Sequence, residues 1–157
     1  MDNRIQIVEG NLHDADHADQ FLRLTAAYMA DPMGEASQWN ESQKSDVINQ
    51  MKDHPCALIL FAKSGDEFVG LCTCFYAYST FLAKPLLNIH DIYVDERFRG
   101  SGVGRLLVEK VGEIAQEKNC GKITLEVRKD NLNARDLYKH QGFKEAPHSM
   151  FFWIKEI

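Results

Sequence analysis

Apolar residues recur with helical or alternating spacing along most of this chain, and the two spacings divide it into helices and strands. Apolar residues three or four positions apart predict four helices, over residues 15–30, 40–51, 103–115 and 133–140. Alternating or continuous apolar residues predict strands over residues 5–8, 56–62, 68–78, 86–94, 123–127 and 150–154. Asp31-Pro32 and Gly142 mark the ends of two of the helices.

The order of these segments predicts an α/β fold in which helices cover a mixed sheet. Residues 64–67, with the sequence Ser-Gly-Asp-Glu, are typical of a hairpin turn, so the strands over 56–62 and 68–78 should be antiparallel neighbours. The strand–helix–strand unit from Ile89 to Val127 should form a right-handed parallel crossover.

The chain has 157 residues, about the length of one domain, and no repeat or linker divides it, so we expect a single domain over residues 1–157. The 18 Lys and Arg against 23 Asp and Glu give a net charge of −5, which disfavours nucleic acid as a partner. The longest apolar run, Cys56–Ala62, is far shorter than the roughly 20 residues of a membrane span. A polar N-terminus without a signal-peptide pattern favours a cytoplasmic protein with no membrane partner.

Four cysteines, Cys56, Cys72, Cys74 and Cys120, are expected to be free thiols in a reducing compartment. Cys72 and Cys74 are two positions apart in a predicted strand and therefore share one face. A metal site would need a matching Cys or His pair, and His90 is the only candidate nearby. We therefore interpret the cysteines as buried core thiols and expect no metal.

A glycine-rich turn, residues 99–104 with the sequence Arg-Gly-Ser-Gly-Val-Gly, connects the predicted strand over residues 86–94 to the predicted helix over residues 103–115. The first turn of a helix has unpaired N–H groups and a partial positive charge, so it attracts anions. Glycines let a phosphate approach the backbone closely, and Arg99 and Arg105 add positive charge. The turn is suited to phosphate, although a plain flexible turn would have the same composition.

Two common phosphate-binding motifs do not fit this turn. A dinucleotide-binding Gly-x-Gly-x-x-Gly fingerprint would need glycine at Arg105 or Leu107, and the chain has no Gly-x4-Gly-Lys-Ser/Thr loop. The pattern Arg-x-x-Gly-x-Gly does fit, with Arg99, Gly102 and Gly104 in place. This pattern resembles the acyl-CoA pyrophosphate loop of the GNAT superfamily of N-acetyltransferases.

A second segment strengthens the resemblance. Residues 133–143, NARDLYKHQGF, are similar to the family signature Asn-x-x-Ala-x-x-Leu/Phe-Tyr-x-x-x-Gly-Phe. Asn133 directly precedes Ala134, whereas Asn131 is nearer the usual offset, so either asparagine could contact the cofactor. The resemblance extends over residues 89–143 and implies the family's fold, a mixed, mostly antiparallel, twisted sheet of about six to seven strands flanked by four helices.

The resemblance also implies how acetyl-CoA would bind. In the family, the strand before the glycine-rich loop separates from the next parallel strand, and the pantetheine arm lies in the gap like an added strand. The main chain of three residues would contact this arm, namely Ile92, Tyr93 and Val94. The pyrophosphate would contact the loop, namely Arg99, Gly100, Ser101, Gly102, Val103, Gly104 and Arg105.

The family's reaction is direct attack of an amine on a thioester in a ternary complex, and it requires two proton transfers. Tyr138 occupies the position of the family's usual acid, with a packed core tyrosine as the alternative. His90 and Asp91 are candidate bases on opposite faces of a regular strand, so only one should face the site, and a bulge could change which one. An ordered water could replace both, and Glu126 on the next strand is a further candidate.

The sequence does not identify the acceptor amine. The loop between the first two helices contains Met33, Glu35, Trp39 and Glu41, which would suit a cationic amine, although a solvated loop would look the same. We expect an acetyl-CoA-dependent N-acetyltransferase that acts on the primary amine of a small molecule. The alternatives are acetylation of a protein lysine or N-terminal amine, and a non-catalytic acyl-CoA-binding regulatory module. Homodimers are common among such enzymes, but no sequence feature indicates one.

Overall fold

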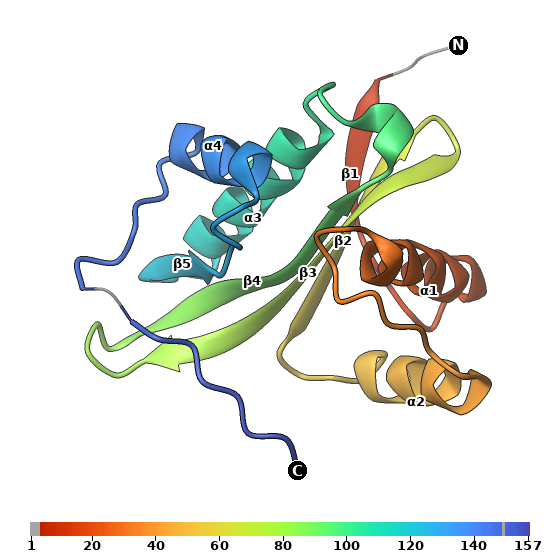
Figure 1. The fold of residues 1–157 in the computed structure, drawn as a ribbon, viewed down its shortest axis with the longest axis horizontal. Helices are drawn as coiled ribbons and strands as arrows, with labels where there is room; N and C mark the ends of the chain where they lie inside the picture. Colours follow the sequence, from red (N-terminus) through yellow and green to blue (C-terminus); the bar gives the residue numbers. More distant parts are fainter. Residues whose placement is uncertain (1–3, 149) are drawn as a thin grey trace.

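The computed structural model describes residues 4–148 and 150–157, so residues 1–3 of the polar N-terminus lie outside it. The described residues form one five-stranded sheet, four α-helices and a short 3₁₀ helix (Figure 1). The strands are β1 (Ile5–Glu9), β2 (Ala57–Ser64), β3 (Glu67–Ser79), β4 (Lys84–Val94) and β5 (Lys122–Leu125). The helices are α1 (Ala15–Ala30), α2 (Glu41–Met51), the 3₁₀ helix η1 (Glu96–Phe98), α3 (Val103–Glu117) and α4 (Leu132–His140). None of the described helices is long and apolar enough to cross a membrane.

The strands follow the chain order β1-β2-β3-β4-β5, and only the pair β4–β5 is parallel. Gly65-Asp66 connects β2 to β3, and Gly65 has a φ of +60°, which glycine adopts without strain. This arrangement confirms the predicted hairpin. The parallel pairing of β4 and β5, with α3 between them in the chain, confirms the predicted parallel connection and the mixed, mostly antiparallel α/β fold.

The helices cover both faces of the sheet (Figure 1). On the face covered by α3 and α4, Leu60 and Leu87 pack in one core with Leu107 of α3. On the face covered by α1 and α2, Phe61 packs in a second core with Leu24 of α1. Because successive strand residues point to opposite faces, the nearly continuous apolar sequence of β2 contributes to both cores.

Side-chain caps fix the starts of the first two helices. The carboxylate of Asp14 accepts a hydrogen bond from the N–H of His17 in the first turn of α1. At the start of α2, the side chains of Asn40 and Gln43 each accept a hydrogen bond from the other's backbone N–H, which forms a capping box. α1 ends immediately before Asp31-Pro32, as predicted.

The predicted number of strands and the predicted final strand are wrong. The sheet has five strands rather than six to seven, and the described residues after α4 contain no strand. Residues 150–154 carry the alternating apolar pattern, but their side chains are 72–86% exposed. Such a pattern shows only that a segment can pair with a strand. A strand also requires the edge of a neighbouring strand, and no strand edge in the described chain is hydrogen-bonded to this segment.

A β-bulge interrupts β4 at His90. Two consecutive residues of β3 pair with Ile89 and Asp91, so His90 between them is an extra residue. Ile89 and Ile92 both pack against the core under α3, although residues three apart face opposite sides of a regular strand. Asp91 and Tyr93 consequently face the α1 side of the sheet.

Candidate functional site

A cavity of about 840 Å³ lies where β4 and β5 separate. The two strands pair only as far as Ile89 and Leu125, and residues beyond these positions line the cavity from both sides. Most of the site residues predicted from the sequence line it: His90, Ile92, Tyr93, Val94, Arg99, Gly100, Gly102, Val103, Gly104, Arg105, Asn131, Asn133 and Tyr138. Asp91 and Ser101 are outside this lining.

The glycine-rich loop forms the wall of the cavity at the start of α3. Gly100 and Gly102 have φ values of +76° and +90°, and a Cβ on either would meet no atom within 4 Å. Gly102 is the N-cap of the 15-residue helix α3, and no side chain caps this end, so its first N–H groups are available to an anion. Gly104 has a different role, because a Cβ there would lie 3.2 Å from Cδ2 of Leu137 on α4.

Arg99, which the resemblance assigns to the pyrophosphate, is anchored by three other groups. Its Nη2 lies 2.7 Å from Oδ2 of Asp31, its Nε donates to the Val94 carbonyl at 3.0 Å, and its guanidinium lies 5.6 Å from the Tyr93 ring centroid. Burial alone would raise the pKa of Asp31, but the Met33 N–H and the Arg99 guanidinium hold that pKa below its ordinary value. Arg99 therefore joins the loop to the exit of α1.

The remaining polar side chains of the loop are also paired. The Ser101 hydroxyl donates to the Phe98 carbonyl at 2.6 Å. Arg105 forms an ion pair of 2.8 Å with Glu109, one turn further along α3. The ion pair uses one of the five N–H donors of the Arg105 guanidinium and leaves the others for an anion.

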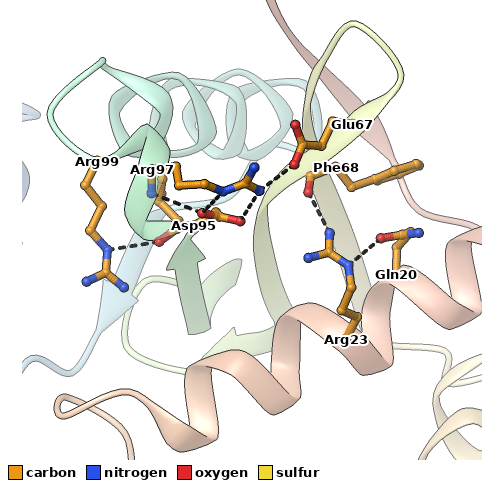
Figure 2. A network of polar contacts seen from close by, with 8 residues as sticks. Gln20, Arg23, Glu67, Phe68, Asp95, Arg97 and Arg99 are labelled. Atoms are coloured by element: carbon orange, nitrogen blue, oxygen red, sulfur yellow. Dashed lines mark hydrogen bonds and ion pairs between the residues drawn. The ribbon is translucent and has the colours of Figure 1, made fainter.

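Arg97, two residues before Arg99, connects the same region to the β2–β3 hairpin (Figure 2). Its guanidinium bridges Asp95, at 2.8 Å, and Glu67. From α1, Arg23 donates to the carbonyl of Phe68 at 2.7 Å, as Figure 2 also shows. These contacts attach α1 and the glycine-rich loop to the same end of the sheet.

The start of α4 brings two asparagines to the cavity. Asn131 is the N-cap of α4, and its side-chain oxygen accepts a hydrogen bond of 3.2 Å from the Ala134 N–H. Asn133 is exposed in the first turn of the same helix. The cap uses the oxygen of Asn131 and leaves its amide N–H groups for a ligand, so both asparagines remain candidate cofactor contacts.

Tyr138 lies on α4, buried, and borders the cavity. Burial raises the pKa of its phenol far above the ordinary range, and the neighbouring Cys72 and Tyr28 act in the same direction. Its ring packs against Phe143 with centroids 5.7 Å apart. Tyr138 is therefore a packed core residue whose protonated phenol borders the cavity, and its role as an acid stays a prediction.

The bulge in β4 directs both candidate bases to one face of the sheet, because Asp91 pairs with Thr73 and the His90 ring contacts Phe75, two residues further along the same face of β3. His90 borders the cavity, with its ring edge-on to Phe75 at a centroid distance of 5.4 Å. Asp91 is half-buried toward α1, where burial raises the pKa of its carboxyl, nearby His90 lowers it and Glu35 raises it. Of the two, His90 lines the cavity and Asp91 does not.

The α1 side of the cavity contains Tyr28, Asp31 and Pro32, which were absent from the sequence-based prediction, and Met33, which was part of it. Burial raises the pKa of the Tyr28 phenol, and the charges of Asp91 and Asp31 add to this effect. No separate pattern marks Tyr28, which fits the apolar stripe of α1, or Asp31, which marks the end of that helix.

Of the other acidic candidates, two lie in or near the cavity and one does not. Glu126 lines the cavity, and Glu35 is close enough to influence the pKa of Asp91. Glu41 is instead paired with Lys44 at 2.7 Å in the first turn of α2. The cavity lining therefore combines aromatic side chains with acidic ones.

The four cysteines are free, and Cys72 and Cys74 are fully buried with their sulfurs 3.6 Å apart. The hydrogen bond between these thiols and their burial raise the pKa of Cys72. The interpretation of this pair as buried core thiols is confirmed. Within residues 4–148 and 150–157, no group of three His, Cys, Asp or Glu side chains could hold a metal ion.

Residues 20–143 match the family model described as the acetyltransferase (GNAT) family. This match covers well over half of the chain, and it includes both segments that resemble the family's signatures. The chain therefore belongs to the GNAT family of acetyltransferases.

Individual relatives support this assignment. An uncharacterized N-acetyltransferase of Archaeoglobus fulgidus is 31% identical over 135 residues, which cover 83% of this chain and 89% of that protein. The thialysine N-epsilon-acetyltransferase of Bos taurus is 29% identical over 110 residues, 67% of this chain and 64% of the relative. That of Sus scrofa is 36% identical over 81 residues, 52% of this chain and 47% of the relative. The chain thus spans between about half and two thirds of the length of these thialysine acetyltransferases.

Solved structures share the fold. The crystal structure of a probable acetyltransferase has a TM-score of 0.83 and 22% identity, and the match covers 97% of this chain and 99% of that one. AAC(6')-Iy, in complex with the bisubstrate analog CoA-S-monomethyl-acetylneamine, has a TM-score of 0.77 and 15% identity, with 97% and 99% covered. These similarities confirm the predicted α/β fold.

Proposed function

We propose that this protein transfers an acetyl group from acetyl-CoA to the primary amine of a small cationic molecule. One cavity brings together the uncapped start of α3, the His90 imidazole and the Tyr138 phenol, at the gap between β4 and β5, and this observation carries the proposal. The same gap leaves the main chain of residues 90–94 unpaired on the β5 side.

The cavity residues fit acetyl-CoA. The N–H groups at the start of α3 and the open space above Gly100 and Gly102 suit a pyrophosphate. The unpaired main chain from Ile92 to Val94 suits an extended pantetheine arm that binds like a strand. When bound, acetyl-CoA supplies an acetyl thioester with an electrophilic carbonyl carbon and a thiolate leaving group.

Two side chains of the chain would move protons. The His90 imidazole accepts a proton from the acceptor amine, which must be uncharged to act as a nucleophile. Tyr138 holds a proton on its hydroxyl, because burial raises its pKa, and can deliver that proton to a thiolate. Positioned proton-transfer groups of this kind each contribute about 10²–10⁴-fold to a rate.

The aromatic and acidic α1 side of the cavity supports a cationic amine as the acceptor. Tyr28 and Tyr93 lie there with ring centroids 6.2 Å apart, near Asp91 and Glu35. The similar proteins include thialysine N-epsilon-acetyltransferases and an aminoglycoside acetyltransferase whose structure is in complex with sisomicin.

An assay of thiol release from acetyl-CoA tests this proposal, with a panel of small amines beside lysine-containing and N-terminal peptides. We expect turnover with at least one small amine, and Tyr138→Phe should lower kcat by about 10-fold or more while the Kd for acetyl-CoA stays within about twofold. Turnover with peptides alone would favour protein acetylation. Binding of acetyl-CoA without turnover of any amine would indicate a non-catalytic binding module.

A further inference from the structure

The hydroxyl of Thr73 is buried and has no hydrogen-bond partner among the described residues. Thr73 is 2% exposed and lies directly opposite Asp91 in the pairing of β3 with β4. The two side chains are therefore neighbours on the face of the sheet that α1 covers. A buried hydroxyl without a partner costs free energy, and a ligand that hydrogen-bonds to it would remove that cost.

The carboxylate of Asp91 is also without a partner. It is half-buried, yet within residues 4–148 and 150–157 it accepts no hydrogen bond and forms no ion pair. Burial raises the pKa of this carboxyl, the charge of His90 lowers it, and the charge of Glu35 raises it further. Glu35, in the loop after α1, is likewise unpaired in the described part of the chain, whereas Asp31 is paired with Arg99. Two unpaired carboxylates that repel each other thus lie near an unpaired hydroxyl.

These groups adjoin the cavity of the proposed active site. Tyr28 lines the cavity, and the charges of Asp91 and Glu35 add to the effect of burial in raising the pKa of its phenol. The ring of His90 contacts Phe75, which is two residues from Thr73 on the same face of β3. Side chains two positions apart on one face of a strand are separated by about 7 Å, so this is the distance from His90 to the unpaired groups.

We propose that Asp91, Thr73 and Glu35 bind a second ammonium group of the acceptor, which is therefore a diamine whose other amine is acetylated beside His90. An ammonium group has three N–H donors, and the site offers one acceptor for each, namely two carboxylates and a hydroxyl oxygen. Its charge would also neutralise the two carboxylates. A chain of about four methylene groups between the two nitrogens spans the separation of about 7 Å. The inference rests on the proposed acetylation of a primary amine, and it adds the second ammonium group and the residues that bind it.

Calorimetry of the full chain with 1,4-diaminobutane tests this site without acetyl-CoA. Asp91→Asn should raise the Kd for the diamine about 10-fold or more, because a hydrogen bond between two charged groups is lost. Thr73→Val keeps the shape of the side chain but removes the hydroxyl, and it should raise the Kd about threefold or more, whereas Thr73→Ser should retain the wild-type Kd. The matched control Asp19→Asn removes one negative charge from an exposed position of α1 and should leave the Kd unchanged. A Kd that Asp91→Asn or Thr73→Val leaves unchanged, or that Asp19→Asn raises equally, would overturn the inference.

Thermal unfolding separates ligand binding by Thr73 from a structural role. Because the hydroxyl has no partner in the ligand-free protein, Thr73→Val should leave the ligand-free Tm unchanged or raise it. A hydroxyl that stabilised the fold would be hydrogen-bonded within it, and its removal would lower the Tm. A lower Tm of ligand-free Thr73→Val would therefore count against the site.

Steady-state kinetics with acetyl-CoA test the second ammonium group during turnover. Asp91→Asn should raise the KM for 1,4-diaminobutane about 10-fold or more and keep kcat within about threefold, while kcat/KM for butylamine, which has no second amine, should not change. A lower kcat with an unchanged KM would make Asp91 a base and overturn the inference. Diamine binding in calorimetry that depends on Asp91 and Thr73, without turnover of any amine, would support this site and refute only the proposed acetyl transfer.

Discussion

Replacement of Arg99 by alanine tests whether this residue joins the glycine-rich loop to α1 before any ligand binds. Its guanidinium makes a 2.7 Å ion pair with Asp31, whose side chain is 9% exposed. A hydrogen bond to a charged group contributes about 1.5–3 kcal/mol, and the lower end applies because the Arg99 side chain is 45% exposed and screened by water. We therefore expect Arg99→Ala to lower the free energy of unfolding by about 1.5 kcal/mol, which corresponds to about 3–6 °C in Tm for a chain of this length.

Thermal and urea unfolding of the ligand-free protein measure this effect. Asp31→Asn should give a similar loss, and the double variant should lose less than the sum, because both substitutions remove one interaction. Arg97→Ala is the matched control: it removes a neighbouring arginine whose ion pairs are more exposed, and it should cost less. If Arg99→Ala left the ligand-free Tm unchanged and only weakened acetyl-CoA binding in calorimetry, a pyrophosphate and not Asp31 would be the main partner of Arg99.

Three further experiments test the site. Gly102→Ala and Gly65→Ala both place a side chain at a positive φ, and each should destabilise the fold by about 1–2 kcal/mol. Only Gly102→Ala should raise the Kd for acetyl-CoA in calorimetry. The same Kd for both variants would contradict the assignment of the loop to the pyrophosphate. His90→Gln should lower kcat by about 10-fold or more in steady-state kinetics, whereas Asp91→Asn should have the smaller effect, and the reverse order would make Asp91 the base. Because the pKa of Asp31 is lowered in the folded protein, its carboxylate stabilises the fold above the ordinary Asp pKa of about 3.9 and loses this effect as the pH falls through the lowered value. Urea unfolding should thus show the stability difference between wild type and Asp31→Asn shrinking in acid, and a difference that grew there would refute the ion pair's role.

The parts of the site that depend on local sequence could be predicted. The glycines of the loop form a local turn before α3, and Tyr138 was recognised through the resemblance of residues 133–143 to a family signature; both line the cavity. The predicted hairpin at Gly65 is similarly a two-residue feature. Predictions of this kind need no knowledge of distant contacts.

Features that depend on long-range contacts could not be predicted. The ion pair between Arg99 and Asp31 joins residues 68 positions apart, and nothing in the spacing of either residue indicates it. The choice between His90 and Asp91 depended on a bulge that appears only in the pairing of β4 with β3. The prediction of a final strand over residues 150–154 was wrong for the same reason, because an alternating pattern does not specify the strand edge with which a segment pairs.

The bulge also adds to β4 one residue, His90, that the pairing with β3 does not require. Deletion of His90 would leave Ile89 and Ile92 on their present face, because it would restore regular alternation between them. The sheet would close without an irregularity, and the cavity would lose its imidazole. Deletion of Asp91 would restore the same alternation and would place His90 opposite Thr73. A chain without His90 would therefore keep the sheet and the core under α3 and would lose the side chain that we propose as the proton acceptor.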